Sequence, residues 1–264
     1  MIINLEKKQT KICVDENINK TIFVCSHERS GTHFLMNSIA TNSNYTVEPY
    51  LNFDLIPLGD TVNFFSASHV KSFVDEISNI KHQNKRHGLS SLIKSHHPSY
   101  IFEELFNNQS FFFFYIYRDP VETLLSFWKF IHHWNWHEGP KLDTPLKFVK
   151  TEPEGQMQRY QKKSYINIFL RWLNHVLEWV EASKKFKNIY LVSYKKLNLD
   201  FNTTIIKIMN LLEIPFNKII KPPKNNYINT IQLELSSNDH NEFVNYIEEN
   251  LSLFPEIKKI IMEN

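Results

Sequence analysis

Cysteine is scarce in this sequence, and a long apolar stretch is lacking. The 264 residues include only two cysteines, Cys13 and Cys25, which are too few for a disulfide framework. Cys25 lies in an apolar run, so we expect a buried free thiol with no redox role. The longest apolar run, Phe111–Tyr117, is well short of the roughly 20 residues that cross a bilayer. A disulfide-rich protein and a membrane-spanning protein are therefore excluded.

An excess of charge of one sign is also missing. The chain carries 30 Lys and Arg against 28 Asp and Glu, a net charge of +2. This balance argues against binding of long nucleic acid, whereas a small anion needs only a few local cations. Residues 1–10 carry charges in place of a signal-peptide apolar region, so we expect a cytoplasmic protein. With 42% hydrophobic residues, the chain can fold as one domain over residues 1–264.

Short apolar runs alternate with helical patterns along the chain. Strands are predicted at Thr21–Ser26, Leu92–Lys94, Phe111–Tyr117 and Asn188–Ser193. Helices are predicted after Thr32, after an Asp119 cap, over Tyr165–Lys185, over Thr203–Leu212 and from about Asn241. Residues 132–160 contain several Pro and Gly and predict a long loop or lid. The alternation predicts an α/β fold, with a parallel sheet flanked by helices.

The segment Ser26–Phe34 (SHERSGTHF) follows the first predicted strand and enters a helix. Such a loop directs unpaired backbone amides and the positive end of the helix dipole at one point, where a phosphate binds well. Gly31 permits close approach, Ser30 and Thr32 add hydroxyls, and Arg29 adds a permanent charge. The loop lacks the first glycine and the lysine of a Walker A motif. The alternative to a P-loop-like anion site is an ordinary capped turn.

A second candidate anion site follows the strand Phe111–Tyr117. Arg118 leaves this strand, and Ser126 lies eight residues further on, inside the predicted helix. This spacing of about two helical turns allows both side chains to face one ligand. The alternative is a helix cap beside a surface arginine.

These segments together resemble the PAPS-dependent sulfotransferase family, where PAPS is 3'-phosphoadenosine-5'-phosphosulfate. The family's K/R-S-G-T loop is matched by Arg29–Thr32, and its K-T-H-x-P element by Lys94–Pro98. The resemblance implies that His96 is the catalytic base, with Arg29 and Lys94 as further catalytic residues. It implies that the donor is bound by residues of the loop, of the next helix and of later segments: Arg29, Ser30, Gly31, Thr32, His33, Phe34, Arg118, Ser126 and Tyr194.

Two later segments extend the resemblance. RWLNHVLEW is similar to the family's W-x-x-H-V-x-E-W helix, which is expected to be structural, and IYLVSYKKL is similar to the strand that ends at Tyr194. The family's C-terminal R-K-G-x-x-G-D-W segment is absent, so another group must cover the 3'-phosphate. Lys221 and Lys224 are the candidates by position, although a solvated basic turn is the alternative.

The resemblance implies an enzyme that transfers a sulfuryl group from PAPS to a hydroxyl or nitrogen of a small molecule, without a metal. The size of the chain and its lid are similar to bacterial natural-product enzymes, including the cyanobacterial saxitoxin sulfotransferases. Aromatic residues and histidines of the lid, with Glu138 and Asp143, are candidates for acceptor contacts: His132, His133, Trp134, Trp136 and His137. The rival readings are a P-loop small-molecule kinase and a non-catalytic nucleotide-binding module. The acceptor and the oligomeric state stay open.

Overall fold

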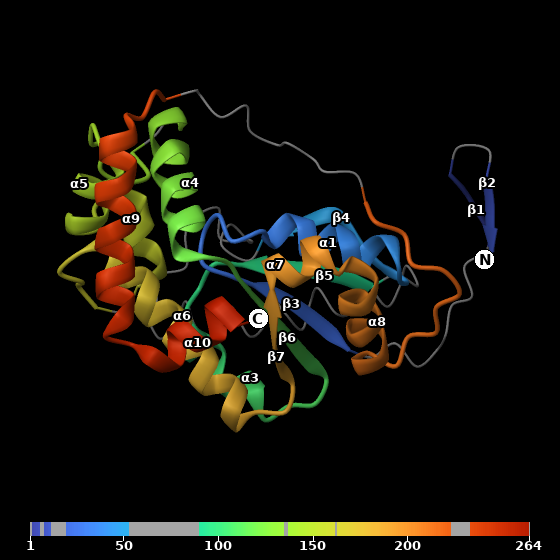
Figure 1. The fold of residues 1–264 in the computed structure, drawn as a ribbon. Coiled ribbons are helices and arrows are strands. Elements are labelled where there is room, and N and C mark those ends of the chain that lie inside the picture. The colour runs from blue at the N-terminus through green and yellow to red at the C-terminus, as the bar shows by residue number, and fades with distance from the viewer. Residues whose placement is uncertain are drawn as a thin grey trace.

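A five-stranded sheet forms the centre of the protein (Figure 1). The structure, a computed structural model, describes residues 2–5, 8–11, 20–52, 90–134, 137–161, 163–222 and 233–263. The strand order is β4-β5-β3-β6-β7. The strands are β3 (Thr21–Cys25), β4 (Tyr45–Asn52), β5 (Ser90–Ser95), β6 (Phe111–Tyr117) and β7 (Ile189–Ser193). All neighbouring pairs are parallel, which confirms the predicted sheet. β1 (Ile2–Leu5) and β2 (Lys8–Lys11) form a separate antiparallel pair.

β3 lies in the middle of the sheet, between β5 and β6. At its carboxyl end, Cys25 pairs with Ser95 of β5 and with Tyr115 of β6. Because the three strands are parallel, the segments that follow them meet at one edge of the sheet. That edge therefore brings together residues 26–31, 96–98 and 118–119.

Helices cover both faces of the sheet. α1 (Thr32–Thr41) and α8 (Phe201–Leu211), which follows α7 (Tyr194–Leu199), pack on one face. The other face carries α6 (Ile168–Lys185), and further helices extend that side (Figure 1): η1 (Ser99–Phe102), α3 (Glu103–Phe106), α4 (Pro120–His133), α5 (Pro145–Lys150), η2 (Gly155–Tyr160), α9 (Ser237–Ser252) and α10 (Pro255–Glu263). No helix in the described ranges has the length and hydropathy needed to cross a membrane.

Several local predictions are confirmed. β6 has the predicted bounds, and Cys25 is a buried thiol that forms no disulfide within the described residues. The side chain of Asp119 caps α4 by accepting a bond from the Glu122 amide at 3.0 Å, with Pro120 at the first helical position. The Glu122 carboxylate pairs with Arg118 at 2.7 Å.

The segment 132–160 is more regular than the predicted loop. α4 continues to His133, and α5 forms because the Thr144 side chain accepts a bond from the Lys147 amide at 3.3 Å. Residues 155–160 form the 3₁₀ helix η2. α6 begins three residues later than predicted, since Asn167 caps it through the Leu170 amide at 2.8 Å. The prolines and glycines do prevent one long helix, but the stretches between them form short helices.

Outside the predicted loop, the elements with no counterpart in the prediction are β1, β2, β4, η1, α3 and α7. α9 begins at Ser237, ahead of the predicted start, because Ser236 caps it. The predicted or candidate positions Cys13, Trp136 and Lys224 lie outside the described residues.

Candidate active site

The loop between β3 and α1 has the backbone of an anion-binding turn. Gly31 precedes α1 with φ of 103°, a left-handed conformation that favours glycine. A Cβ at this position would clash with the ring of Tyr194. Arg29 also has positive φ, at 67°. Ser26 Oγ and Thr32 Oγ1 share a hydrogen bond of 2.6 Å across the buried side of the loop. The loop is therefore fixed at both ends and packed against Tyr194.

The two candidate anion elements meet directly. Arg29 Nε donates to Ser126 Oγ at 3.2 Å, and the Arg29 guanidinium lies over the Phe130 ring at 5.1 Å. Arg118 Nη1 donates to the Arg29 carbonyl at 3.4 Å. Burial, followed by the charge of Arg118, lowers the pKa of Arg29. Two cations that repel each other in one partly buried place form a site that an anion would stabilise.

Lys94 adds a positive charge at this edge, beside the imidazole of His33. His33 is exposed on the first turn of α1, whereas Lys94 is buried near the end of β5. Desolvation by the surrounding protein, then the charges of Lys94 and Arg29, lowers the pKa of His33 to about 4. With that pKa the His33 ring is neutral at pH 7, so the cations come from the loop and from β5, and α1 adds a neutral imidazole.

Aromatic rings lie next to these cations. Phe34 contacts Tyr194 and Phe201, with ring centroids 6.1 Å apart in each pair. The Arg118 guanidinium lies over the Tyr194 ring at 4.5 Å. Lys221 Nζ lies 5.9 Å from the centre of the Phe34 ring and donates to the Asn198 carbonyl at 2.9 Å. Flat apolar surface beside positive charge is suited to a nucleotide base with its phosphate.

His96 follows β5 and faces the loop. Its Nδ1 lies 3.0 Å from the Ser26 carbonyl and 3.3 Å from Ser26 Oγ. A carbonyl only accepts, so the geometry assigns the proton to Nδ1 and leaves the lone pair on Nε2. This is the tautomer that a general base requires.

α6 holds the backbone of His96 and His97. His175 Nε2 lies 3.0 Å from the His96 carbonyl, and Trp179 Nε1 donates to the His97 carbonyl at 3.2 Å. Because His175 Nε2 must donate, its Nδ1 accepts from the Tyr115 hydroxyl at 2.9 Å. Burial lowers the pKa of His175 well below its usual value, so the ring is neutral. The helix that the sequence reading took as structural therefore supports the candidate catalytic histidine.

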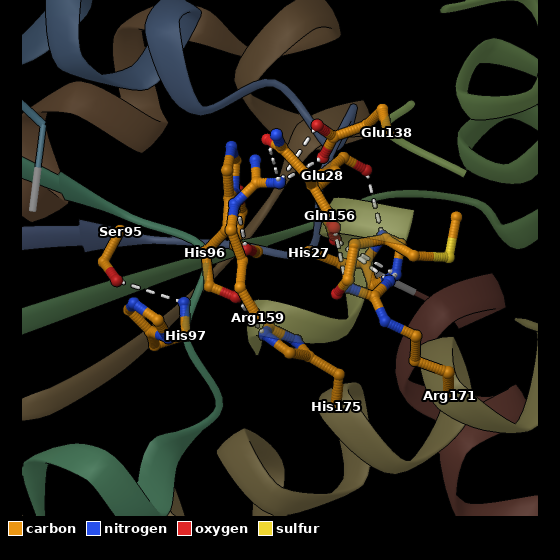
Figure 2. Close-up of polar contacts among 12 residues, drawn as sticks. His27, Glu28, Ser95, His96, His97, Glu138, Gln156, Arg159, Arg171 and His175 are labelled. Carbon is orange, nitrogen blue, oxygen red and sulfur yellow. Dashed lines mark hydrogen bonds and ion pairs between the residues drawn. The ribbon is translucent and has the colours of Figure 1, made fainter. Parts of the chain in front are cut away.

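A buried ion pair lies behind the loop (Figure 2). Arg171 of α6 binds the Glu28 carboxylate through two bonds of 2.6 and 3.2 Å. Arg171 also donates to His27 Nε2 at 2.9 Å. Burial alone would raise the pKa of Glu28, but the charge of Arg171 holds it well below the usual range. Burial lowers the pKa of His27 to about 4, so that ring is neutral and donates from Nδ1 to the Glu28 carbonyl.

Residues of the segment 137–161 contact the His96 ring. The Tyr160 ring lies edge-on to the His96 ring at 5.8 Å, and the Arg159 guanidinium lies over Tyr160 at 4.4 Å. Glu138 is buried and pairs with Arg159 at 2.9 Å. Asp143 pairs with Lys147 at 3.2 Å. Both acids that the sequence offered for a cationic acceptor therefore have partners within the chain.

The histidines and tryptophans of the predicted lid, residues 132–160, mostly contact other residues of the lid or of α4. His132 Nε2 and Trp128 Nε1 both donate to the Leu142 carbonyl, at 2.8 and 2.7 Å. The Trp134 ring packs at a tilt against Phe130, with ring centroids 4.6 Å apart. His137 lies exposed beside Glu154. These contacts are those of a packed aromatic patch.

The sequence reading missed four residues at this site: His27, Glu28, Tyr160 and Arg171. Arg171 and His175 are four residues apart on α6, so they lie on one face of a helix that also carries Trp172 and Trp179. An arginine and a histidine on an apolar helical face were the available signal. The partner Glu28 is 143 residues away in sequence.

Comparisons with known proteins agree with the motifs. The family model for the sulfotransferase domain matches residues 19–259. An amine sulfotransferase of Oryctolagus cuniculus is 26% identical over 124 residues, which are 46% of this chain and 36% of that protein. Sulfotransferase 2A1 of Macaca fascicularis is 28% identical over 169 residues, 61% of this chain and 53% of that protein. The chain therefore spans only about a third to a half of these relatives.

Among solved structures, mouse sulfotransferase SULT7A1 complexed with PAP is similar at a TM-score of 0.49. The two sequences are 21% identical, and the match covers 76% of this chain and 60% of that chain.

Proposed function

This chain belongs to the sulfotransferase family, and from that premise we propose that it transfers a sulfuryl group from PAPS to a small-molecule acceptor. One observation carries the proposal. A glycine-containing loop, two adjacent arginines and a histidine in its base-competent tautomer meet at one edge of a parallel sheet. Ligands of parallel α/β sheets bind at this edge. The proposed enzyme is one domain over residues 1–264.

The residues at the edge suit a nucleotide with phosphates at both ends. In the proposal, the loop from Arg29 to His33 holds the 5'-phosphosulfate, with amides at the start of α1 directed at it. Arg118 and Ser126 hold the 3'-phosphate, and Phe34 and Tyr194 contact the adenine. The Arg29–Ser126 bond of 3.2 Å joins these two groups, so a ligand anion would exchange for that bond. Mutual repulsion of Arg29 and Arg118 favours this exchange.

In the proposed reaction, His96 Nε2 removes the proton of the acceptor hydroxyl or amine as the acceptor attacks sulfur. The new bond joins sulfur to the acceptor atom, and the bond between sulfur and the phosphate oxygen breaks. Arg29 and the loop amides stabilise the charge that develops on that phosphate oxygen. Lys94 is assigned to the transferred group. Positioning and electrostatic stabilisation supply most of the catalysis, as in phosphoryl transfer.

The acceptor class is the finer part of the proposal. The resemblance to natural-product enzymes makes saxitoxin-type guanidinium compounds sensible members of a first acceptor panel. A cationic acceptor would have to compete with Arg159 and Lys147 for the carboxylates of Glu138 and Asp143. Neutral alcohols, phenols and amines therefore belong beside them in the panel. The proposal includes a cytoplasmic location and a role in natural-product biosynthesis.

The test compares nucleotides by thermal unfolding. We expect adenosine 3',5'-bisphosphate to raise the melting temperature without Mg²⁺, by an amount that corresponds to about 2.7 kcal/mol at a hundredfold excess over Kd. ATP with Mg²⁺ should do little. The reverse ranking would favour a small-molecule kinase.

Turnover needs a separate measurement. The protein is incubated with ³⁵S-labelled PAPS and a metabolite extract, and products heavier by one sulfuryl group are identified. Binding of the bisphosphate with no labelled product from any acceptor, and none from water, would instead indicate a nucleotide-binding module.

A further inference from the structure

Arg171 joins three segments that are far apart in the sequence. Its guanidinium binds both oxygens of Glu28, in the loop before Arg29. The same group donates to the Met157 carbonyl in η2 at 3.1 Å. Arg171 is itself buried on α6. One side chain thus connects the donor-side loop to η2. Figure 2 shows Arg171 beside Glu28 of the loop and Gln156 of η2.

Other polar contacts of η2 go to neighbouring residues of the same segment: Arg159 pairs with Glu138 at 2.9 Å, and Gln158 Nε2 donates to the Pro153 carbonyl at 2.8 Å. The Gln156 amide donates to the His137 carbonyl at 3.0 Å, and the Met157 amide donates to the Glu138 carbonyl at 2.8 Å. These bonds join η2 to residues 137–138 but not to the sheet. Tyr160, at the end of η2, contacts both His96 and His97, at 5.8 and 5.0 Å between ring centroids. The position of Tyr160 relative to His96 therefore depends on how η2 is held.

A buried ion pair is weak evidence of added stability. The cost of removing Arg171 and Glu28 from water offsets much of their attraction. A protein with two apolar side chains of similar volume in their place is often equally stable. Apolar side chains, however, would not fix the orientation of the groups around them. The fork fixes the Glu28 carboxylate in a plane, and the third bond fixes the Met157 carbonyl relative to it.

We propose that Arg171 is a positioning residue that fixes η2 to the donor-side loop and so places Tyr160 against His96. The linkage itself is independent of the ligand; only its effect on turnover rests on the proposed sulfuryl transfer. Loss of Arg171 would leave the sheet, the loop and α6 in place, but would release η2.

Hydrogen exchange of the ligand-free protein tests the linkage. The double variant Glu28→Met/Arg171→Met removes both charges, so that neither is left buried alone. We expect the Gln156 and Met157 amides to exchange on the order of tenfold faster, while amides within α6 keep their protection. Asn174→Ala is the matched control, because Asn174 lies one turn further on α6 and bonds only to the Leu170 carbonyl at 2.8 Å.

A second variant tests the linkage if the double variant folds poorly. Arg171→Lys keeps the charge against Glu28 but cannot make the fork and the third bond together. Faster exchange at Gln156 and Met157 in this variant, with a native melting temperature, supports the proposal. Unchanged exchange at both amides in every folded variant overturns it, and so does faster exchange that spreads equally over α6.

The consequence for turnover is measured with the acceptor found in the labelling experiment. The folded variants should bind adenosine 3',5'-bisphosphate within about threefold of the parent, because the loop is retained. Their kcat should fall on the order of 10²-fold through misplacement at the active site. Absence of nucleotide binding in the parent protein would defeat the proposed function and leave the exchange result standing.

Discussion

The two ends of the candidate site neutralise their charged side chains in different ways. Around Arg171, the partners are buried side chains and carbonyls within the protein, and the Arg171 side chain is 3% exposed. Around Arg118, the partner carboxylate of Glu122 is 56% exposed. Exposed pairs of this kind contribute little to stability, whereas removing one member of a buried pair is costly.

This difference separates groups that hold the site from groups that are available to a ligand. Glu28 is buried, and one guanidinium binds both of its oxygens, so its charge is neutralised within the protein. Arg118 exchanges its surface partner at low cost, and it already lies over an aromatic ring. Lys221, at the same end, donates to a backbone carbonyl. In the proposed site, the buried end fixes the geometry and the exposed end supplies cations to an incoming anion.

Replacement of His96 should have the largest effect, because its ring stands between the two ends. His96→Ala should lower kcat by about 10²- to 10⁴-fold, the usual contribution of a general base, and leave the affinity for adenosine 3',5'-bisphosphate unchanged. Steady-state sulfuryl transfer and calorimetric titration measure the two quantities. His240→Ala on α9 is the control. A variant that keeps more than about a tenth of kcat would remove His96 from the reaction.

The buried end should also make stability depend on pH. Burial lowers the pKa of His27 from 6.5 to about 4, and that of His175 in the same direction. Between those values the unfolded chain binds the proton and the folded protein does not, so stability falls as the pH decreases from 6.5 toward 4. His27 alone should cost about 2 kcal/mol at pH 5 relative to pH 7.5. Because the pKa of Glu28 is lowered below its usual value of 4.5, its own contribution is lost only at still lower pH.

Chemical denaturation at pH 7.5 and at pH 5 measures this loss. His27→Gln removes the titrating ring and keeps a polar side chain in its place. Its free energy of unfolding should fall less over the same interval than that of the parent. An equal fall in both proteins would show that His27 does not carry the dependence.

The sheet was predictable because its strands are continuous apolar runs. Phe111–Tyr117 is buried along its whole length, and no polar residue interrupts the pattern. β4 was missed because it contains Glu48 and Pro49 and pairs only with β5, at the edge of the sheet, where proline is tolerated. Burial on both faces produces a clear signal in sequence, and an edge strand does not.

The motif residues of the site were predictable one by one, but their partners were not. The contact between Arg29 and Ser126 joins positions 97 residues apart, and the pair of Arg171 with Glu28 spans 143. Each of these residues has an ordinary local explanation as a cap, a turn or a surface charge. Only the packing of α6 on the sheet decides that Arg171 is buried, and burial then requires a carboxylate beside it.

Substitutions at the exposed end should change nucleotide affinity the least, and those at Arg118 and Glu122 should change it in opposite directions. Arg118→Met should weaken binding of adenosine 3',5'-bisphosphate by about tenfold, the contribution of one charged hydrogen bond, and leave binding of adenosine 5'-phosphate unchanged. Glu122→Gln should do the opposite, strengthening the bisphosphate by about twofold, because an exposed pair no longer competes for the guanidinium. Calorimetric titration of both nucleotides against both variants measures the four affinities. If Glu122→Gln weakened the bisphosphate, Glu122 would be orienting Arg118 rather than competing for it, and this end of the site would be built in advance like the other.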